Sequence, residues 1–140
     1  MRRGDGGPFG ACIVRGGRLV ALGHNRVLGS GDPTQHAEIV AIHRASRRLG
    51  SHVLAGCTLY STTEPCPMCF AAIHWARIAG VRFGTTIADV RRLGFNELSV
   101  SNRALKRLGA SPVRLGAPLA RSECRALLVR WKALPNRRTY

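Results

Sequence analysis

Four side chains in this sequence have the chemistry to bind a metal ion and to move a proton beside it. His36 and Glu38 lie two positions apart, and Cys66 and Cys69 follow in a P-C-x-x-C motif. One imidazole and two thiolates make three ligands. The fourth position is left open, as in catalytic rather than structural zinc sites. Glu38 is close enough to reach that position without being a ligand, so the pattern predicts zinc-assisted hydrolysis.

The His36 and Glu38 pair and the Cys66 and Cys69 pair are each expected in the first turn of a helix. The positive partial charge there lowers the pKa of a thiol and favours the thiolate that zinc requires. Zinc lowers the pKa of a bound water to roughly 7. Glu38 is then expected to take up the proton of that water, pass it to a ring nitrogen and protonate the departing amine. H-x-E followed by P-C-x-x-C is also the signature of zinc-dependent nucleobase deaminases.

A C-x-x-C pair has two other common uses, as a redox pair or as half of a structural zinc finger. The sequence has no second C-x-x-C pair and no H-x₃₋₅-H pair, so a closed Cys₂His₂ site lacks its fourth ligand. His43 lies about two helical turns beyond His36, too far to share the ion. The catalytic interpretation is therefore preferred. The other candidate ligands are His24, His52 and His74.

The chain is strongly basic, with a formal charge of +15 from 20 arginines and two lysines against seven acidic residues. Such a charge favours a polyanion such as RNA as a partner. The arginine clusters are short and dispersed, however, so a solvated surface explains them as well. RNA is thus an alternative ligand that the sequence does not favour over a small molecule.

Length and composition point to one domain over residues 1–140, with 45% hydrophobic residues. No apolar run approaches the roughly 18 residues that span a membrane. The basic residues 1–3 precede a glycine-rich stretch rather than an apolar one, so no export signal is expected. A cytoplasmic location is predicted, with three cysteines as buried thiols: Cys12, Cys57 and Cys124.

The elements that must position the motif alternate along the chain. A β-hairpin is expected around Gly16-Gly17, and a helix is expected to begin at Asp32 and Pro33 and to end at Gly50. This alternation predicts a three-layer α/β/α fold with a mixed central sheet. The full set comprises strands at 11–14, 18–22, 57–61, 81–85 and 112–115, and helices at 32–50, 65–77, 101–108 and 122–134.

Two runs of sequence resemble the cytidine deaminase superfamily: D-P-T-Q-H-A-E-I-V-A-I and T-E-P-C-P-M-C-F-A-A-I-H-W-A-R. Within it, the chain is most similar to bacterial guanine deaminases, from residue 6 to about residue 98. The tRNA-specific adenosine deaminases share the H-A-E and P-C-x-M-C cores and come next. The resemblance implies a cytidine-deaminase-like fold, a zinc cofactor, a homodimer, and deamination of a purine base, foremost guanine to xanthine plus ammonia.

The same resemblance implies four substrate-binding residues. Phe9 and Trp75 correspond to aromatic residues that face the base, and Asn25 offers a donor and an acceptor to its edge. Glu97 is expected to discriminate among the bases, the alternatives being that it caps its loop or pairs with an arginine. Guanine presents N1–H and the C2 amine as adjacent donors, which one carboxylate can accept together. Adenine and cytosine present a ring-nitrogen acceptor beside their amine, which a carboxylate would repel.

The chain departs from the guanine deaminase pattern at three places. Glu97 stands where that family commonly has Asp. The helix that precedes the first strand in the family has no counterpart, so one sheet face is expected to lack its cover. Family members also exchange C-terminal segments that bring a terminal aromatic to the partner's pocket, and Tyr140 stands at a comparable end.

Three alternatives to a guanine deaminase remain. A tRNA adenosine deaminase is favoured by the charge and disfavoured by Glu97. A cytosine or cytidine deaminase is a weaker third reading. The chain could also be an inactive, zinc-stabilised RNA-binding module. Glu38 argues against that last reading, because such a module would not need a base beside an open metal position.

Overall fold

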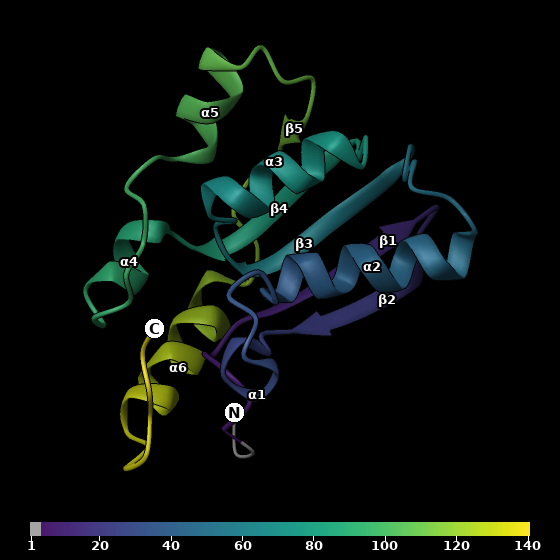
Figure 1. Cartoon of the computed structure of the whole chain (residues 1–140). Coiled ribbons are helices and arrows are strands. Elements are labelled where there is room, and N and C mark those ends of the chain that lie inside the picture. Colours follow the sequence, from purple (N-terminus) through teal and green to yellow (C-terminus); the bar gives the residue numbers. More distant parts are fainter. Residues whose placement is uncertain (1–3) are drawn as a thin grey trace.

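The computed structural model describes residues 4–140 and shows one mixed sheet with helices on both faces (Figure 1). The basic start at residues 1–3 lies outside the described residues. The five strands are ordered β2-β1-β3-β4-β5. The strand β1 is antiparallel to β2 and β3, whereas β3, β4 and β5 are parallel. The strands are β1 (Gly10–Arg15), β2 (Arg18–His24), β3 (Cys57–Thr63), β4 (Gly80–Thr85) and β5 (Arg114–Leu115).

Six helices complete the described chain, and the expected three-layer α/β/α architecture is confirmed. Helices α2 and α3 cover one face of the sheet, and α6 packs on β4 at the other face (Figure 1). The three short helices lie in the connections between these elements. The helices are α1 (Val27–Ser30), α2 (Ala37–Leu49), α3 (Pro67–Trp75), α4 (Ile87–Arg91), α5 (Asn102–Leu108) and α6 (Arg121–Lys132).

The main core lies between the sheet and helices α2 and α3. Alternate residues of β3 are buried, as expected for a strand with one face in the core. Ile13, Leu59 and Val81 are fully buried in this layer. At Gly23 an added Cβ atom would lie 2.3 Å from the Ala37 carbonyl oxygen, so only glycine lets α2 approach the sheet this closely. This contact places the first turn of α2 against the sheet.

The opposite face of the sheet is only partly covered. Near β4 the cover is close, since a Cβ atom at Gly84 would lie 2.3 Å from Cys124 Sγ of α6. Farther along the sheet, Cys12 and Tyr60 line an open groove, and Leu22 is 58% exposed. This agrees with the expectation that one sheet face lacks a full cover.

Two arginines of α2 protect the free edge of the sheet. The strand β2 is an edge strand, which leaves backbone groups open to pairing with another chain. Arg44 Nη1 donates to the Leu22 carbonyl at 2.8 Å, and Arg48 Nη1 donates to the Val20 carbonyl at 3.0 Å. Part of the unusual arginine content therefore has a structural use.

The predicted start of the helix at Asp32 is wrong. Asp32 accepts hydrogen bonds from the backbone N–H and the hydroxyl of Thr34, which closes a turn instead of a helix. Helix α2 begins at Ala37, with His36 as an extended N-cap residue. In the same way, α3 begins at Pro67 and not at Pro65, with Cys66 as its N-cap residue. His36 and Cys66 therefore have extended backbone and lie just outside the regular turns of their helices.

Other differences from the sequence prediction are small. The β-hairpin is confirmed, and Gly16 and Gly17 both have positive φ in its turn. The stretch between residues 85 and 101, where no helix or strand was predicted, contains α4, and β5 is only two residues long. Helix α1 was not predicted either. No helix within residues 4–140 is long and apolar enough to cross a membrane.

Candidate metal and substrate site

Helices α2 and α3 bring three metal-type ligands together at their N-termini. His36 caps α2, Cys66 caps α3, and Cys69 lies in the first turn of α3. Their ligand atoms lie within 4.8 Å of one another, and Cys66 Sγ is 3.6 Å from His36 Nδ1. Two sulfurs and one nitrogen at this spacing fit a zinc ion with an open fourth position. Ligands that are 30 or more positions apart in the sequence therefore lie together in the fold.

The two thiols of this group have opposite acid–base properties. A hydrogen bond from Cys69, together with the nearby His36 imidazole, lowers the pKa of Cys66 to about 4. The same sulfur–sulfur contact and burial raise the pKa of Cys69. The pair thus shares a proton, and binding of a divalent cation by such thiols releases it.

Glu38 is buried beside the ligand group in the first turn of α2. Its side chain is 5% exposed, and Ser61 Oγ donates a 2.9 Å hydrogen bond to its Oε1 atom. Its Oε2 atom faces Cys69 Sγ at 3.6 Å. Burial raises the pKa of the Glu38 carboxyl. A carboxyl with a raised pKa, fixed at one oxygen and with the other directed at the metal-type ligands, is suited to carrying a proton.

A small cavity of about 20 Å³ opens beside these groups. Three of the four predicted substrate residues line it together with the metal-type ligands. It has room for about one water molecule but not for a purine. The lining residues are Phe9, Asn25, His36, Glu38, Thr63, Glu64, Cys66 and Glu97.

Glu97 reaches this cavity from the irregular segment between α4 and α5. Burial raises the pKa of its carboxyl, and the nearby Cys66 and Glu38 act in the same direction. Asn25 is 2% exposed, its Oδ1 accepts from the Val27 N–H at 3.2 Å, and its Nδ2 is buried with no partner among the described residues. Asn25 lies close to the Tyr140 side chain, since it is among the groups that lower the pKa of Tyr140.

Tyr140, in the C-terminal segment of the same chain, lies near the residues that line the cavity. Its ring lies 6.2 Å from the His36 ring and 5.6 Å from the Phe95 ring, and its carbonyl accepts from the Asn96 N–H at 3.3 Å. Its hydroxyl is also buried without a partner among the described residues, and burial raises its pKa. Asn25 Nδ2 and the Tyr140 hydroxyl, both buried and without a well-formed hydrogen bond among the described residues, thus lie near each other beside the cavity.

Trp75, predicted to contact the substrate, does not line this cavity. It is the last residue of α3 and is 78% exposed, and it lines a different hollow with His52 and Arg77. The reason is helical geometry. Six positions after Cys69 correspond to about 1.7 turns, so Trp75 points to another side of α3 than the metal-type ligand.

Sequence reasoning missed two cavity residues, Thr63 and Glu64, and the Glu38 partner Ser61. Ser61 and Thr63 lie on the buried side of β3, where polar residues are uncommon. Two polar residues at alternate positions of a buried strand were the available signal. Glu64 is 9% exposed directly after the strand. A buried acidic residue next to a P-C-x-x-C motif was the corresponding signal for Glu64.

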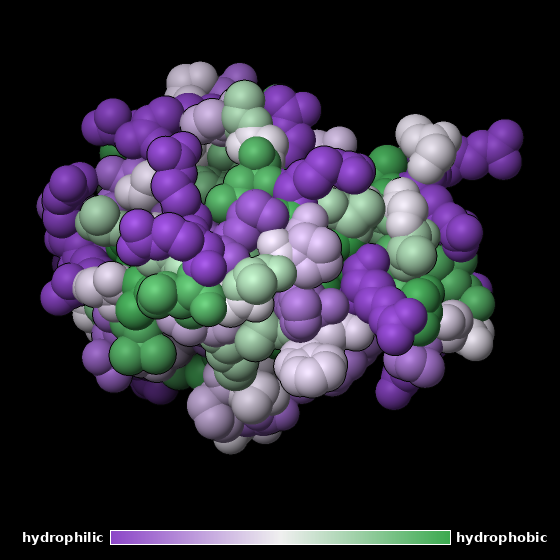
Figure 2. All heavy atoms as spheres, turned by 90° about the horizontal axis from the view of Figure 1, so that it is seen from above, coloured by the Kyte–Doolittle hydropathy of each residue, from purple (hydrophilic) through white to green (hydrophobic). Residues whose placement is uncertain are grey.

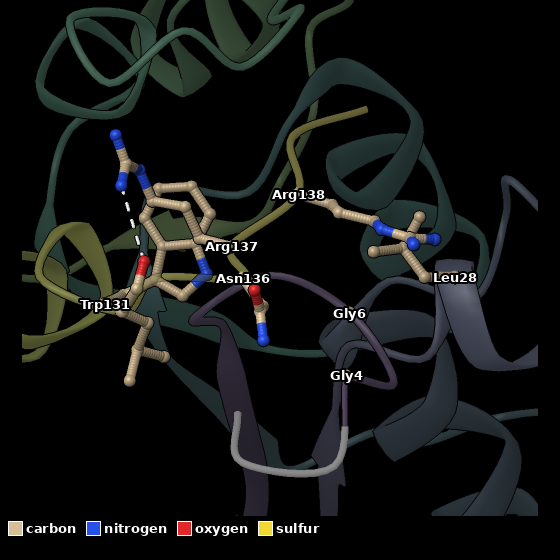
Figure 3. A pocket seen from close by; sticks show the side chains of 8 residues that line it. Gly4, Gly6, Leu28, Trp131, Asn136, Arg137 and Arg138 are labelled. Atoms are coloured by element: carbon tan, nitrogen blue, oxygen red, sulfur yellow. Dashed lines mark hydrogen bonds between the residues drawn. The ribbon is translucent and has the colours of Figure 1, made fainter.

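A larger hollow of about 360 Å³ lies beside Trp131 and the C-terminal segment (Figure 3). Trp131 lines it and packs on Phe95 at 4.8 Å between ring centroids. Phe95 in turn packs on Phe9, which lines the small cavity. The side chains of Arg137 and Arg138 point to opposite sides of the hollow in Figure 3. They do not converge as an anion site would require.

Most of the positive charge has no acidic partner within residues 4–140. Arginine ion pairs there involve one carboxylate, that of Asp89, with Arg92 and Arg121. Figure 2 shows hydrophilic side chains spread over the face viewed, with smaller hydrophobic areas between them. Hydrophilic side chains therefore cover much of this face.

Comparison with known proteins agrees with this site. Residues 2–85 match the cytidine and deoxycytidylate deaminase zinc-binding region. The chain therefore belongs to this family of zinc-binding deaminase domains. Zinc is the cofactor that the family and the His36, Cys66 and Cys69 group together indicate.

Relatives of two substrate classes share substantial identity with the chain. Guanine deaminase of Bacillus subtilis is 48% identical over 97 residues, which are 69% of this chain and 62% of that protein. The tRNA-specific adenosine deaminase of Aquifex aeolicus is 49% identical over 76 residues, which are 54% of this chain and 50% of that protein. The chain thus spans less than two thirds of the length of these relatives.

Solved structures resemble the chain over more of its length. The guanine deaminase from Nitrosomonas europaea has a TM-score of 0.84 and 32% identity, covering 95% of this chain and 79% of that one. A structure in complex with 2,6-diaminopurine has a TM-score of 0.86 and 32% identity, covering 99% of this chain and 77% of that one.

Proposed function

We propose that this chain, as a single domain over residues 1–140, catalyses zinc-dependent hydrolytic deamination of a purine base, with guanine as the leading substrate. In this reaction guanine and water give xanthine and ammonia. One observation carries the proposal. A buried carboxylate, Glu38, and a second carboxylate, Glu97, line the same cavity as two of the zinc-type ligands.

His36, Cys66 and Cys69 would hold the zinc ion. When bound, zinc supplies a Lewis acid that lowers the pKa of a water molecule to roughly 7. Because His36 and Cys66 are N-cap residues, their side chains extend from the converging helix ends without distorting either helix. The positive ends of both helix dipoles favour the anionic thiolates.

Glu38 moves the protons. Ser61 fixes Oε1, so Oε2 is the oxygen that takes a proton from the attacking water and delivers it to the ring nitrogen. Glu38 then gives a proton to the amine as the C–N bond breaks. Burial raises the pKa of this carboxyl, which helps it hold the proton between the two transfers.

Glu97 and Asn25 select and orient the base. The Glu97 carboxylate accepts from the N1–H and C2 amine donors of guanine, and the unpartnered Asn25 Nδ2 donates to an acceptor on the ring. Phe9 packs against one face of the base. The cavity is too small for a purine as it stands, so the residues around it move apart when the base enters.

Xanthine formation from guanine, followed by absorbance, tests this proposal. We expect turnover by the wild-type protein and a loss of at least about 100-fold in Glu38→Gln, the range of general acid–base catalysis. Zinc content, measured by mass spectrometry, should be the same in both proteins. Equal turnover in the two proteins would show that Glu38 moves no proton, and loss of zinc would make it a ligand.

A tRNA-specific adenosine deaminase is the second candidate. The net charge and the identity to the Aquifex relative favour it. The Glu97 carboxylate beside Asn25 in the cavity disfavours it, because N1 of adenine is an acceptor that the carboxylate would repel.

The protein is further proposed to be a cytoplasmic homodimer. The five cysteines are all free, which suits a reducing compartment. Three large apolar side chains on α3 and α5 are exposed: Met68 at 36%, Trp75 at 78% and Leu108 at 77%. Such side chains suit a protein interface. Sedimentation analysis of the wild type and of Trp75→Lys tests this, because a dimer through this face should dissociate in the variant.

A further inference from the structure

Glu64 is a buried carboxylate with no part in the proposed proton transfer. It lies two residues before Cys66 and lines the small cavity. Both of its oxygens accept backbone hydrogen bonds, Oε1 from the Asn102 N–H at 2.9 Å and Oε2 from the Ile87 N–H at 3.3 Å. Ile87 begins α4 and Asn102 begins α5. One side chain therefore ties two helix starts to the loop that carries a zinc-type ligand.

Asn102 strengthens the same connection from the other side. Its side chain is fully buried, and its Nδ2 donates a 2.6 Å hydrogen bond to the carbonyl of Pro65. Glu64 and Asn102 thus form reciprocal bonds between the start of α5 and the two residues before Cys66. The Glu64 N–H in turn donates to the Thr85 carbonyl at 2.8 Å, which fixes Glu64 on the sheet.

The segment between these two attachment points carries Glu97. Residues 92–101 form neither helix nor strand. The backbone bonds of Glu97 and Val100 are short-range, from the Glu97 N–H to the Phe95 carbonyl at 3.0 Å and from the Val100 N–H to the Leu98 carbonyl at 2.9 Å, and the Asn96 N–H reaches only the C-terminal Tyr140 carbonyl at 3.3 Å. Such bonds shape a turn but do not hold it against the sheet. Phe95 provides an apolar attachment within the segment, and Glu64 provides the polar attachment at both ends.

We propose that Glu64 is a positioning residue that sets the place of Glu97 relative to the metal site and thereby the choice of base. This rests on the proposed role of Glu97 in selecting guanine. Glu64 itself does not contact the reacting atoms, because both of its carboxylate oxygens are occupied by backbone donors.

The variant Glu64→Gln tests this role with almost no change in size. A glutamine has one acceptor oxygen, and its NH₂ group would face one of the two backbone donors, so one attachment is lost. We expect hydrogen exchange in residues 92–101 to become roughly tenfold faster. The kcat/KM ratio for guanine over 2,6-diaminopurine should fall, because N1 of diaminopurine is an acceptor that a well-placed Glu97 disfavours. Zinc content should not change.

Two further variants complete the design. Ile13→Val removes a buried methyl group from the core without touching the segment, so it controls for general loss of stability. Asn102→Ala keeps the backbone bond to Glu64 and removes the bond to Pro65. If Glu64→Gln does not fold, Glu64→Asp decides the question by the same two measurements, because its shorter side chain cannot reach both backbone donors.

Faster exchange in residues 92–101 with a lower substrate ratio, absent in Ile13→Val, is the expected result. Wild-type exchange and an unchanged ratio in Glu64→Gln would overturn the proposal, as would equal changes in Ile13→Val. Hydrogen exchange does not depend on turnover. Faster exchange in a protein whose wild type releases no ammonia from guanine would therefore support the attachment by Glu64 and reject the guanine assignment.

Discussion

The Ser61 hydroxyl donates a 2.9 Å hydrogen bond to Oε1 of Glu38, and both side chains are buried. Ser61 lies on β3 and Glu38 on α2, so the bond joins the sheet to the first turn of the helix. It fixes one carboxylate oxygen and leaves the other directed at the metal-type ligands. The geometry of proton transfer therefore depends on a strand residue outside the zinc motif.

Replacing Ser61 with Ala should lower kcat without a matching change in KM. Without the hydrogen bond, the Glu38 carboxylate is less well oriented and less of the enzyme has Oε2 in the reactive position. We expect a loss of about tenfold, measured by steady-state deamination of guanine. Thr58→Ala, at a half-exposed position of the same strand, is the control. Unchanged kcat in Ser61→Ala would show that the bond does not orient Glu38.

Replacing Glu97 with Gln should impair guanine selectively. The amide presents one acceptor and one donor group where two donors of guanine need acceptors, so kcat/KM should fall roughly 10- to 100-fold. Turnover of 2,6-diaminopurine should change much less. Glu123→Gln removes the same charge from an exposed position in α6 and should behave as wild type. Equal effects on both purines would assign Glu97 a structural role.

Removal of zinc should destabilise the protein as well as inactivate it. The ligands connect the N-termini of α2 and α3, so a bound ion stabilises the folded state over the unfolded chain. At a free zinc concentration about 100 times Kd the gain is ~2.7 kcal/mol. Thermal unfolding with and without a chelator measures this. Cys66→Ser should lose the chelator effect and Cys12→Ser should keep it, whereas the reverse pattern would reject the ligand assignment.

Asp89 should make stability depend on pH at the acidic end. Its carboxylate accepts from the backbone N–H and the hydroxyl of Thr86, which forms a capping box at α4, and Arg121 and Arg92 lie nearby. These contacts, first the Thr86 N–H, lower the pKa of Asp89 below its usual 3.8. A lowered pKa stabilises the fold above the unfolded value, and this contribution is lost as the pH falls through the folded value.

The variant Asp89→Asn measures that contribution. Its free energy of unfolding at pH 7 should be about 1 kcal/mol below that of the wild type, as for other helix caps. The gap should narrow below about pH 4, because the wild-type carboxyl becomes neutral there as well. Urea denaturation at the two pH values checks this. A gap that stays constant would show that the charge contributes nothing.

The ligand group could be predicted from the sequence because zinc fixes the types and spacing of its ligands. His36, Cys66 and Cys69 converge as the motif requires. The helix start at Asp32 was wrong, since the same residues that cap a helix also close the turn with Thr34. Whether residues 32–35 form a turn or a helix depends on where the fold places His36, the N-cap residue of α2, which is a tertiary property.

The rest of the cavity depends on contacts that local sequence does not contain. Trp75 shares a helix with Cys69 but points to another side, which the helical period would have indicated. Glu64 and Asn102 meet across 38 positions of chain, and nothing local predicts that contact. Residue types thus indicated the reaction, whereas the residues that line the cavity could be identified only from the fold.

Ammonia release from a panel of substrates tests the central proposal most directly. The zinc-loaded protein should be assayed at equal concentrations of guanine, cytosine, adenosine and a transfer RNA, with Glu38→Gln as the blank. We predict that guanine gives the highest kcat/KM by a wide margin. Ammonia release from transfer RNA with inosine formation, and none from guanine, would contradict the assignment of Glu97 and make the chain a tRNA-modifying deaminase.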